Sequence, residues 1–589
     1  MLVKPSKWQP VGIKQLELAA EQAVRALSNT LVVAGPGAGK TELLAQRACF
    51  LLQTGLCARP HRILAISFKR DAARNLGDRV RLRCGDELSA RFDSFTFDSF
   101  AKRLDDHFLS GLPQPWRPSK DYEMKLKELQ WKPITRIAVE PPQSTALWKK
   151  FLHDRRPSWM NFSMLSVLAE HILTVNPFVL TALRRTYAFV FLDEFQDTTD
   201  LQYQLTVTAF LGSHAILTAV GDPKQTIMQW AGALTGIFGR FKSDFGSSVL
   251  RPALNHRSVP KLVRIQGFLA TALEKRNTPQ IPPEDATDAR GECRIFSFED
   301  STAEARFLAS SAKSWIDSEG LVPRDICILT RNRPPDYTGQ LQSELRKLGI
   351  TARIESELQD LLAEPVSSML VDFLRLGAAE RCPTSWANAL DIVRKTYGGD
   401  SEESQRQIER ALSKFVKRLR SLLKKTGSKS QDIHNILREI VSFVGSKAFQ
   451  ALHPQYAQGD YLSSTIAQLG WYLSEFRKSM EWNEALDELE GMNAVPIMTI
   501  HKSKGLEYHT VVFVGFEDSA FWNFHRKPTE ETCTFFVAFS RAKNRVVFTF
   551  CEHRAKPAGA PLEPQHRATV GPLYAILEQA GVSIEHITE

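Results

Sequence analysis

The sequence of 589 residues predicts an α/β protein built on parallel β-sheets. Two observations favour this fold class. An apolar run at 31–34 leads into a glycine-rich turn and then a helix-forming segment, which is the order strand, loop, helix. Two further apolar runs, at 188–192 and 215–220, end in polar turns in the same way. By contrast, residues 366–489 show helical periodicity and no notable strand-like run, which predicts a large helical insert.

The segment 29–41, NTLVVAGPGAGKT, has the pattern of a phosphate-binding P-loop. Three glycines allow successive backbone N–H groups to turn inward around a triphosphate, namely Gly35, Gly37 and Gly39. The helix that follows directs the positive end of its dipole at the same phosphates. Lys40 is then placed to reach the β- and γ-phosphates, and Thr41 to bind Mg²⁺.

The second half of a nucleotide site is predicted where the run 188–192 ends in Asp193 and Glu194. A P-loop ATPase requires a carboxylate at the end of a neighbouring strand to hold Mg²⁺, and a base that orients the attacking water. Asp193 fits the first role and Glu194 the second. Gln225 follows the run 215–220, where a side chain from a strand end can sense the γ-phosphate. We therefore predict a site for ATP and Mg²⁺.

Composition narrows the class of protein, its expected location and its possible partners. The hydrophobic content of 43% and the charged content of 24% are ordinary for a globular protein. No apolar stretch approaches the roughly 18 residues of a membrane span, and the N-terminal segment lacks the apolar core of a signal peptide, so we expect a cytoplasmic protein. The eight cysteines form no CxxC pair and are expected to be reduced, mostly buried thiols. The net charge of +9 permits a polyanionic partner.

A series of motifs, ordered along most of the chain, resembles the motifs of the UvrD/Rep family of superfamily 1 helicases. Besides the P-loop, the matching segments are 63–73 (motif Ia), 96–100 (the TFHSF segment), 192–198 with Gln202 (the DEFQDT…Q motif), 221–233 (motif III), 255–258 (motif IV), 499–508 (motif V) and 537–542 (motif VI). One P-loop is a common match, but the whole series in the correct order is specific.

The resemblance implies a role for each matching residue of the ATP site. From the first lobe, ATP and Mg²⁺ are expected to be surrounded by Lys40, Thr41, Asp193, Glu194 and Gln225. From the second lobe, Arg257 and Arg541 are expected to neutralise charge on the phosphates, although a lone arginine is more often a plain surface residue. Glu507 is expected to contact the ribose, and His256 to stack on adenine.

The resemblance also implies a path for single-stranded nucleic acid. Phe68 and Trp230 are expected to offer aromatic faces to the bases, with core packing as the alternative for both. Contacts at or beside the backbone phosphates are expected from Ser67, Thr96, Thr499 and His501.

Several positions depart from the family's pattern or leave a choice open. The family holds adenine with a glutamine upstream of the P-loop, and Gln15 fits its local pattern better than Gln22. In motif III, Ala231 stands where the family has arginine, and Met228 where it has an aromatic residue. His256 replaces the usual tyrosine, and an imidazole can stack but covers less area. We expect ATP hydrolysis to persist, with altered coupling to DNA.

The resemblance divides the chain into four units. Residues 1–104 and 165–246 are expected to form a RecA-like lobe (1A), and residues 247–365 and 490–589 a second RecA-like lobe (2A), each with a parallel sheet. Each lobe carries a mainly helical insert, 105–164 (1B) and 366–489 (2B). Within 2B, residues 414–425 form a basic amphipathic pattern, which suits a DNA-facing surface, a partner surface or a solvated face.

The function implied is that of an ATP-dependent translocase or helicase on single-stranded or tailed duplex DNA, moving 3′ to 5′. The compact inserts and the substituted Ala231 and Met228 suggest a rival function. Compact UvrD-like proteins occur beside nuclease subunits in bacterial anti-phage systems such as Gabija. In that case the protein is a DNA-sensing ATPase that regulates a partner nuclease, with little unwinding.

Overall fold

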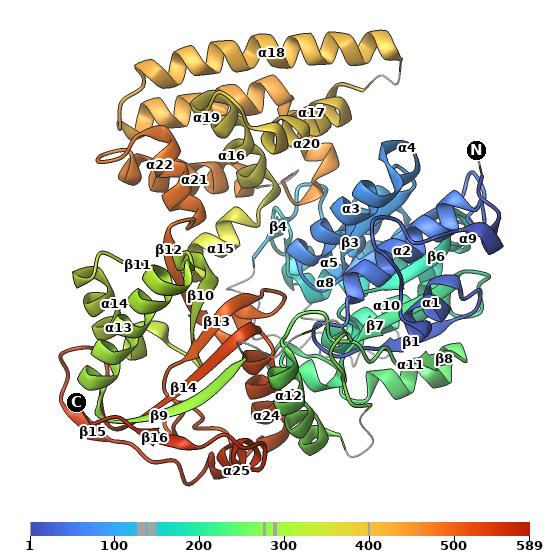
Figure 1. The fold of residues 1–589 in the computed structure, drawn as a ribbon. Coiled ribbons are helices and arrows are strands. Elements are labelled where there is room, and N and C mark those ends of the chain that lie inside the picture. Colours follow the sequence, from blue (N-terminus) through green and yellow to red (C-terminus); the bar gives the residue numbers. More distant parts are fainter. Residues whose placement is uncertain are drawn as a thin grey trace.

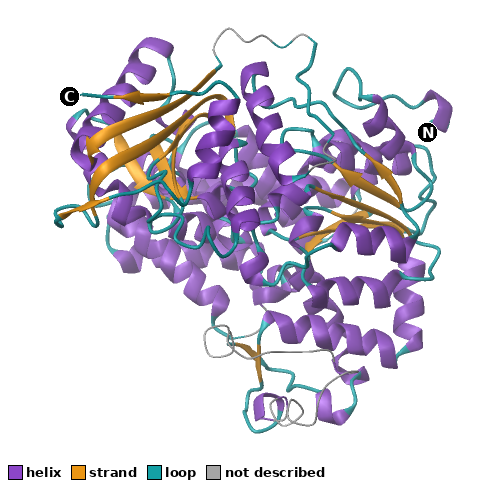
Figure 2. Ribbon diagram, turned by 90° about the horizontal axis from the view of Figure 1, so that it is seen from below, coloured by secondary structure: helices purple, strands orange, loops and turns teal. Residues whose placement is uncertain are grey.

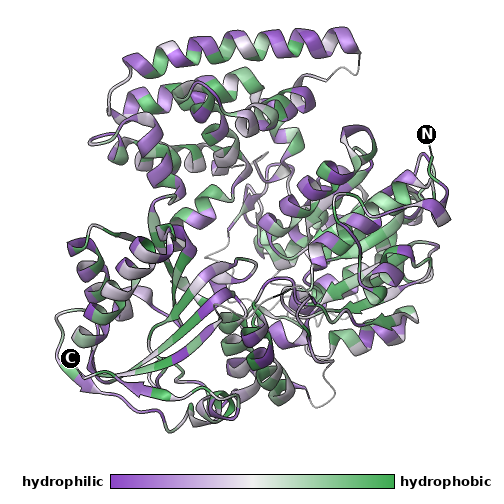
Figure 3. Ribbon diagram, in the orientation of Figure 1, coloured by the Kyte–Doolittle hydropathy of each residue, from purple (hydrophilic) through white to green (hydrophobic). Residues whose placement is uncertain are grey.

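Two α/β lobes and a helical unit make up the protein in a computed structural model (Figure 1). The structure describes residues 2–125, 137, 148, 150–274, 278–284, 286, 291–398, 401–456 and 459–588. Seen from below, the sheets of the two lobes lie on opposite sides of the molecule (Figure 2). The strands of both sheets are predominantly hydrophobic in Figure 3, because helices cover them on both faces.

The first lobe is built on a parallel sheet of six strands in the order β3-β2-β6-β7-β1-β8. These strands are β1 (Thr30–Val33), β2 (Arg62–Ser67), β3 (Phe92–Thr96), β6 (Tyr187–Leu192), β7 (Ile216–Gly221) and β8 (Ser248–Leu250). Because the strands are parallel, their carboxyl ends meet at one edge. The P-loop after β1, the acidic turn after β6 and Gln225 after β7 are therefore brought together.

Helices of the first lobe pack around this sheet: α1 (Leu18–Arg25), α2 (Lys40–Gln53), α3 (Arg70–Cys84), α4 (Asp86–Ser89), α5 (Phe97–Phe108), α8 (Phe162–Val175), α9 (Pro177–Thr186), α10 (Asp200–Phe210) and α11 (Ile237–Phe245). In the described part of the chain, no single helix is long and apolar enough to span a membrane. Only α8 and α9 together, bent by 103° at their junction, reach that length and apolarity.

The boundary between the two lobes that was predicted at residue 246 lies one strand too early. Strand β8 pairs in parallel with β1, through Thr30 opposite Ser248, and so belongs to the first lobe. A three-residue strand without alternation carries no signal for which sheet it joins, and the partner strand lies more than two hundred positions away.

The second lobe is built on a sheet in the order β11-β12-β10-β13-β14-β9-β16, with β15 paired antiparallel to β14. Its strands are β9 (Glu292–Asp300), β10 (Ile326–Thr330), β11 (Thr351–Ile354), β12 (Ala494–Thr499), β13 (Tyr508–Phe513), β14 (Ala542–Ala555), β15 (Leu562–Pro564) and β16 (Ile584–His586). Its helices are α12 (Pro260–Leu273), α13 (Ser301–Glu319), α14 (Pro334–Lys347), α15 (Ser356–Leu362), α23 (Ile500–Ser503), α24 (Pro528–Phe539) and α25 (Gly571–Gln579). Motif V thus enters at the carboxyl end of β12.

The helical unit at the top of Figure 1 interrupts the second lobe between β11 and β12. It consists of α16 (Pro365–Ala378), α17 (Pro383–Tyr397), α18 (Glu402–Lys425), α19 (Ser430–Val444), α20 (Ser446–Leu452), α21 (Tyr461–Phe476) and α22 (Trp482–Glu490). On α18 the predicted apolar side is buried at Phe415, Leu419 and Leu423, whereas Leu422 is only half-buried. The opposite side of α18 is hydrophilic in Figure 3.

The insert of the first lobe differs from the mainly helical prediction in its described residues. It contains the short helical turns η2 (Leu109–Gly111) and η3 (Gln114–Trp116) and a parallel pair of strands, β4 (Glu123–Met124) and β5 (Trp159–Met160). The prolines at 113, 115 and 118 interrupt helical hydrogen bonding here. Most of 126–149 lies outside the described residues.

The cysteine prediction needs one correction. Cys49 of α2 and Cys84 at the end of α3 form a disulfide. The other six cysteines are free, and all of these except Cys382 are buried. Sequence spacing did not reveal the pair, because 35 positions separate two residues that meet only when α2 packs on α3.

Candidate ATP and nucleic-acid site

The P-loop follows β1 and ends where α2 begins at Lys40. Gly37 and Gly39 have φ angles of 74° and 69°, a region that favours glycine. The Lys40 ammonium donates to the carbonyls of Ala34 and Gly35, at 3.3 and 3.1 Å. Burial lowers the pKa of Lys40, while the nearby carboxylates of Glu194, Asp222 and Asp193 act in the opposite direction. The loop and its lysine are arranged as a polyanion site requires.

The acidic turn after β6 lies beside the P-loop. The Asp193 carboxylate is buried and accepts a 2.9 Å hydrogen bond from the Glu194 N–H. Glu194 has a φ of 48°, which is uncommon for a residue other than glycine. Burial alone would raise the pKa of Glu194, but Lys504 and Lys40 lower it to about 2. Glu194 is therefore ionised, as a base for water requires.

Arginines from the second lobe reach the same cleft. The Arg541 guanidinium donates to the side-chain oxygen of Gln225 at 3.3 Å, across the gap between the lobes. Arg541 is 2% exposed, and burial lowers its pKa to about 9. Arg257 donates to Glu507 at 2.9 Å and to the Ser540 carbonyl at 2.9 Å. The predicted residues Gln225, Arg257, Arg541 and Glu507 are thus brought together.

Lys504 is a member of this cluster to which we assigned no role from the sequence. Its ammonium lies 2.6 and 2.8 Å from the two carboxylate oxygens of Asp197 and donates to the Gln225 carbonyl at 2.8 Å. Both side chains of the ion pair are 2% exposed. In the sequence, Lys504 is visible only as a lysine within the matching motif V segment, and the motif alone does not indicate its partner.

Two of the residues predicted to bind single-stranded nucleic acid, Trp230 and Phe68, contact the second lobe, and their accessibility differs. Trp230, in the turn η7 (Gln229–Ala231), is 69% exposed and its ring centroid lies 6.2 Å from that of His501. Burial and the nearby Arg331 lower the pKa of His501 to about 4, so the ring is neutral near pH 7. Phe68 is half-buried and packs against the core of the second lobe.

The hydroxyl residues of the predicted path are local structural elements in this arrangement. Thr96 and Thr499 are the N-caps of α5 and α23, where each side chain accepts a backbone N–H. Ser67 is fully buried, and its hydroxyl has no partner within the described residues. A contact of Ser67 at or beside the backbone phosphates stays a prediction.

Two side-chain oxygens fit a magnesium ion at the cleft, those of Thr41 and Asp193. Thr41 opens α2 directly after Lys40, and the buried Asp193 carboxylate lies near the Lys40 ammonium. Mg²⁺ prefers oxygen ligands and is usually held by one or two protein groups together with substrate phosphates. This donor set therefore fits the ion.

Two family models match the chain over more than half its length. The UvrD/REP helicase N-terminal domain matches residues 16–110 and 118–246, and the UvrD-like helicase C-terminal domain matches residues 392–553. The chain belongs to the UvrD/Rep family of superfamily 1 helicases. It is accordingly an ATP-hydrolysing DNA helicase.

Relatives of this UvrD/Rep-family helicase span nearly its whole length. DNA helicase II of Escherichia coli (strain K12) is 25% identical over 90% of this chain and 83% of its own length. DNA helicase II of Rickettsia typhi is 22% identical over 89% of this chain and 90% of its own length. The ATP-dependent DNA helicase Rep of Buchnera aphidicola is 21% identical over 89% of this chain and 91% of its own length.

The residues predicted to contact adenine are exposed in this arrangement. Gln15 and Gln22 are both exposed, so their competition for adenine is not decided by burial. The His256 side chain is exposed, while its backbone N–H donates to the Gly37 carbonyl at 2.9 Å. Glu507, expected at the ribose, is held by Arg257 and by Lys543, at 2.9 Å each.

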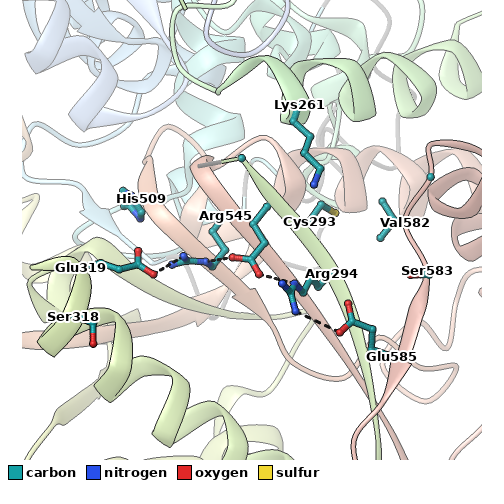
Figure 4. A pocket seen from close by; sticks show the side chains of 13 residues that line it. Lys261, Cys293, Arg294, Ser318, Glu319, His509, Arg545, Val582, Ser583 and Glu585 are labelled. Atoms are coloured by element: carbon teal, nitrogen blue, oxygen red, sulfur yellow. Dashed lines mark hydrogen bonds and ion pairs between the residues drawn. The ribbon is translucent and has the colours of Figure 1, made fainter. Parts of the chain in front are cut away.

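A cavity of the helicase lies elsewhere, on the second lobe (Figure 4). It has a volume of about 810 Å³ and is lined by charged side chains that pair with one another. Arg545 contacts Glu292 and Glu319, and Arg294 contacts Glu292 and Glu585. None of the predicted site residues lines it.

Proposed function

We propose that this helicase couples ATP hydrolysis in the cleft between its lobes to 3′-to-5′ movement along single-stranded DNA. Lys40 and the P-loop would bind the triphosphate, with Thr41 and Asp193 holding Mg²⁺, which offsets phosphate charge when bound. Glu194 takes a proton from the water that attacks the γ-phosphorus as the bond to the β-phosphate oxygen breaks.

The observation that carries this proposal is the convergence of charge from both lobes on one cleft. Gln225 of the first lobe and Arg541 of the second are already in hydrogen-bond contact. Lys504 pairs with Asp197 across the same boundary. A cation from the second lobe reaches the γ-phosphate end only when the lobes are together, so turnover and lobe movement are coupled.

The nucleic-acid side of the proposal rests on Trp230 and its neighbour His501. Trp230 belongs to the first lobe and His501 to the second, so a base held at this contact touches both halves of the motor. Stacking on an aromatic face tolerates any base, as a translocating enzyme requires. Direction is inferred from the family resemblance.

Strand displacement tests the proposal directly. A labelled strand is annealed to partners that leave a 3′ or a 5′ single-stranded tail, and its release is followed with ATP and Mg²⁺. We expect release from the 3′-tailed duplex only, and none with Glu194→Gln. Release from the 5′-tailed duplex alone would contradict the proposed direction.

A second candidate is a DNA-sensing ATPase that regulates a partner nuclease in phage defence. It is favoured by Ala231 and Met228, which replace the arginine and the aromatic residue usual in motif III, and Met228 is buried rather than presented to a base. DNA-stimulated ATP hydrolysis without displacement of either tailed strand would support this candidate over the first.

A further inference from the structure

A short extended segment around Ile281 pairs with the residues that lead into motif IV, next to the P-loop. Leu254 and Ile281 form a parallel bridge. The Ile281 N–H donates to the Ala253 carbonyl at 3.0 Å, and the Asn255 N–H donates to the Ile281 carbonyl at 2.9 Å. Gln280 is therefore fixed in register beside the residues that lead into His256 and Arg257.

From this position Gln280 reaches the first turn of the P-loop. Its side-chain N–H₂ donates to the Pro36 carbonyl at 2.9 Å. Its carboxamide lies over Gly35, where a Cβ atom would stand 2.5 Å from the carboxamide carbon. The three atoms nearest to that Cβ position all belong to Gln280. Gly35 thus allows the close approach of the Gln280 carboxamide.

We propose that Gln280 is a positioning residue of the ATP site, through which the second lobe holds the leading turn of the P-loop. The proposal rests on the proposed role of the P-loop in binding ATP. Two further contacts support it. The Asn255 side chain, itself fully buried, lies with its N–H₂ 3.5 Å from the Gln280 carboxamide oxygen and orients the amide. The His256 N–H meets the next carbonyl of the loop, that of Gly37.

The chemistry of this position favours an amide. The Pro36 carbonyl requires a donor, and the Asn255 N–H₂ requires an acceptor, and a glutamine supplies both at once. A carboxylate cannot donate to Pro36 and would bring negative charge toward the triphosphate. Gln280 is neutral, unlike Arg257 and Arg541, so it acts on the shape of the loop and not on charge that develops during hydrolysis. Its loss should therefore change ATP affinity more than the maximal rate.

Steady-state ATPase kinetics with saturating single-stranded DNA test this inference. Gln280→Ala is expected to raise the KM for ATP roughly threefold to tenfold, the effect of one neutral hydrogen bond, with kcat within about twofold of wild type. Gln280→Glu should raise KM further. The matched control is Pro279→Ala, at the exposed neighbouring position, which should leave KM unchanged.

Binding of a fluorescent ADP analogue supplies a readout independent of turnover, and its Kd should rise in parallel with KM. If the alanine variant unfolds, the same measurements are made with Gln280→Met. This variant keeps the side-chain volume but lacks the amide. Equal KM and Kd values in wild type and every Gln280 variant would overturn the inference. Wild-type ATPase activity reports separately on the proposed function, which this result would leave intact.

Discussion

The ammonium of Lys504 and the carboxylate of Asp197 form a buried ion pair between the two lobes, with N–O distances of 2.6 and 2.8 Å. Asp197 is three residues after Glu194, and Lys504 is three residues before Glu507. Among the cations that lower the pKa of Glu194, Lys504 has the largest effect. One contact thus links the acidic turn of the first lobe, which contains Glu194, to motif V of the second.

Loss of this pair should uncouple the lobes. Removing one partner of a buried ion pair leaves the other charge uncompensated in the interior. Lys504→Met is therefore expected to disrupt the contact between the lobes and to lower the DNA-stimulated kcat roughly tenfold or more. Lys502→Met is the control, because Lys502 pairs with the exposed Asp360. In a double-mutant cycle, Asp197→Asn should add little to Lys504→Met. Fully additive effects would contradict the coupling.

Arg541 should contribute to the chemical step. A cation supplied to the transferring phosphoryl group is worth about a thousandfold or more in kcat, which is the loss expected for Arg541→Ala. Arg541→Lys, which retains a charge but not the guanidinium geometry, should be intermediate. Arg294→Ala removes an arginine of the same lobe that lines the separate cavity of Figure 4, and should leave kcat unchanged. Wild-type hydrolysis by Arg541→Ala would exclude the role.

Trp230 should be the main stacking contact for single-stranded DNA. A base–aromatic stack is worth about 1–3 kcal/mol, so Trp230→Ala should raise the Kd for an oligo(dT) roughly fivefold to 150-fold. Fluorescence anisotropy at fixed salt measures this. Trp471→Ala, which removes a 53% exposed tryptophan from α21 of the helical unit, is the control. Equal Kd values for the two variants would show that Trp230 does not stack.

A buried carboxyl group on α5 should make stability depend on pH. Asp105 is fully buried, and neither oxygen has a partner within the described residues. Burial and the neighbouring Asp106 raise its pKa well above the ordinary value, against the opposing charge of Lys102. The folded state therefore favours the protonated acid, and this stabilisation is lost as pH rises through the raised pKa.

Asp105→Asn removes that titration. Relative to wild type, the variant's Tm should increase as pH is raised from 5 to 8, because only the wild type must keep a buried carboxyl group protonated on folding. For Asp121→Asn, at an exposed position of the same lobe, the Tm difference from wild type should stay constant over this pH range. A Tm difference that stays flat for Asp105→Asn would contradict the raised pKa.

Local pattern predicted much of this molecule. The P-loop, the acidic turn and the strands near 188–192 and 215–220 follow from runs of apolar residues that end in characteristic polar residues. Contacts between distant segments could not be predicted in this way. The strand pairing of β8, the Cys49–Cys84 disulfide and the Gln280–Pro36 contact each depend on packing between elements, and no short pattern encodes it.

The same limit applied within the site. Lys504 and Asp197 were both inside matched motifs, yet their pairing appears only when the lobes face each other. Ser67 matched its motif too, but the packing around β2 buries its hydroxyl completely. A motif therefore identified the neighbourhood, and the fold decided which side chains are accessible.

The central claim is that unpaired DNA stimulates ATP hydrolysis in the cleft between the lobes. Phosphate release by the purified protein, measured with Mg²⁺ and with or without a single-stranded oligonucleotide, tests it most directly. We predict release that rises strongly with the oligonucleotide and is abolished by Glu194→Gln. Release that is unaffected by the oligonucleotide, or that survives Glu194→Gln, would contradict it.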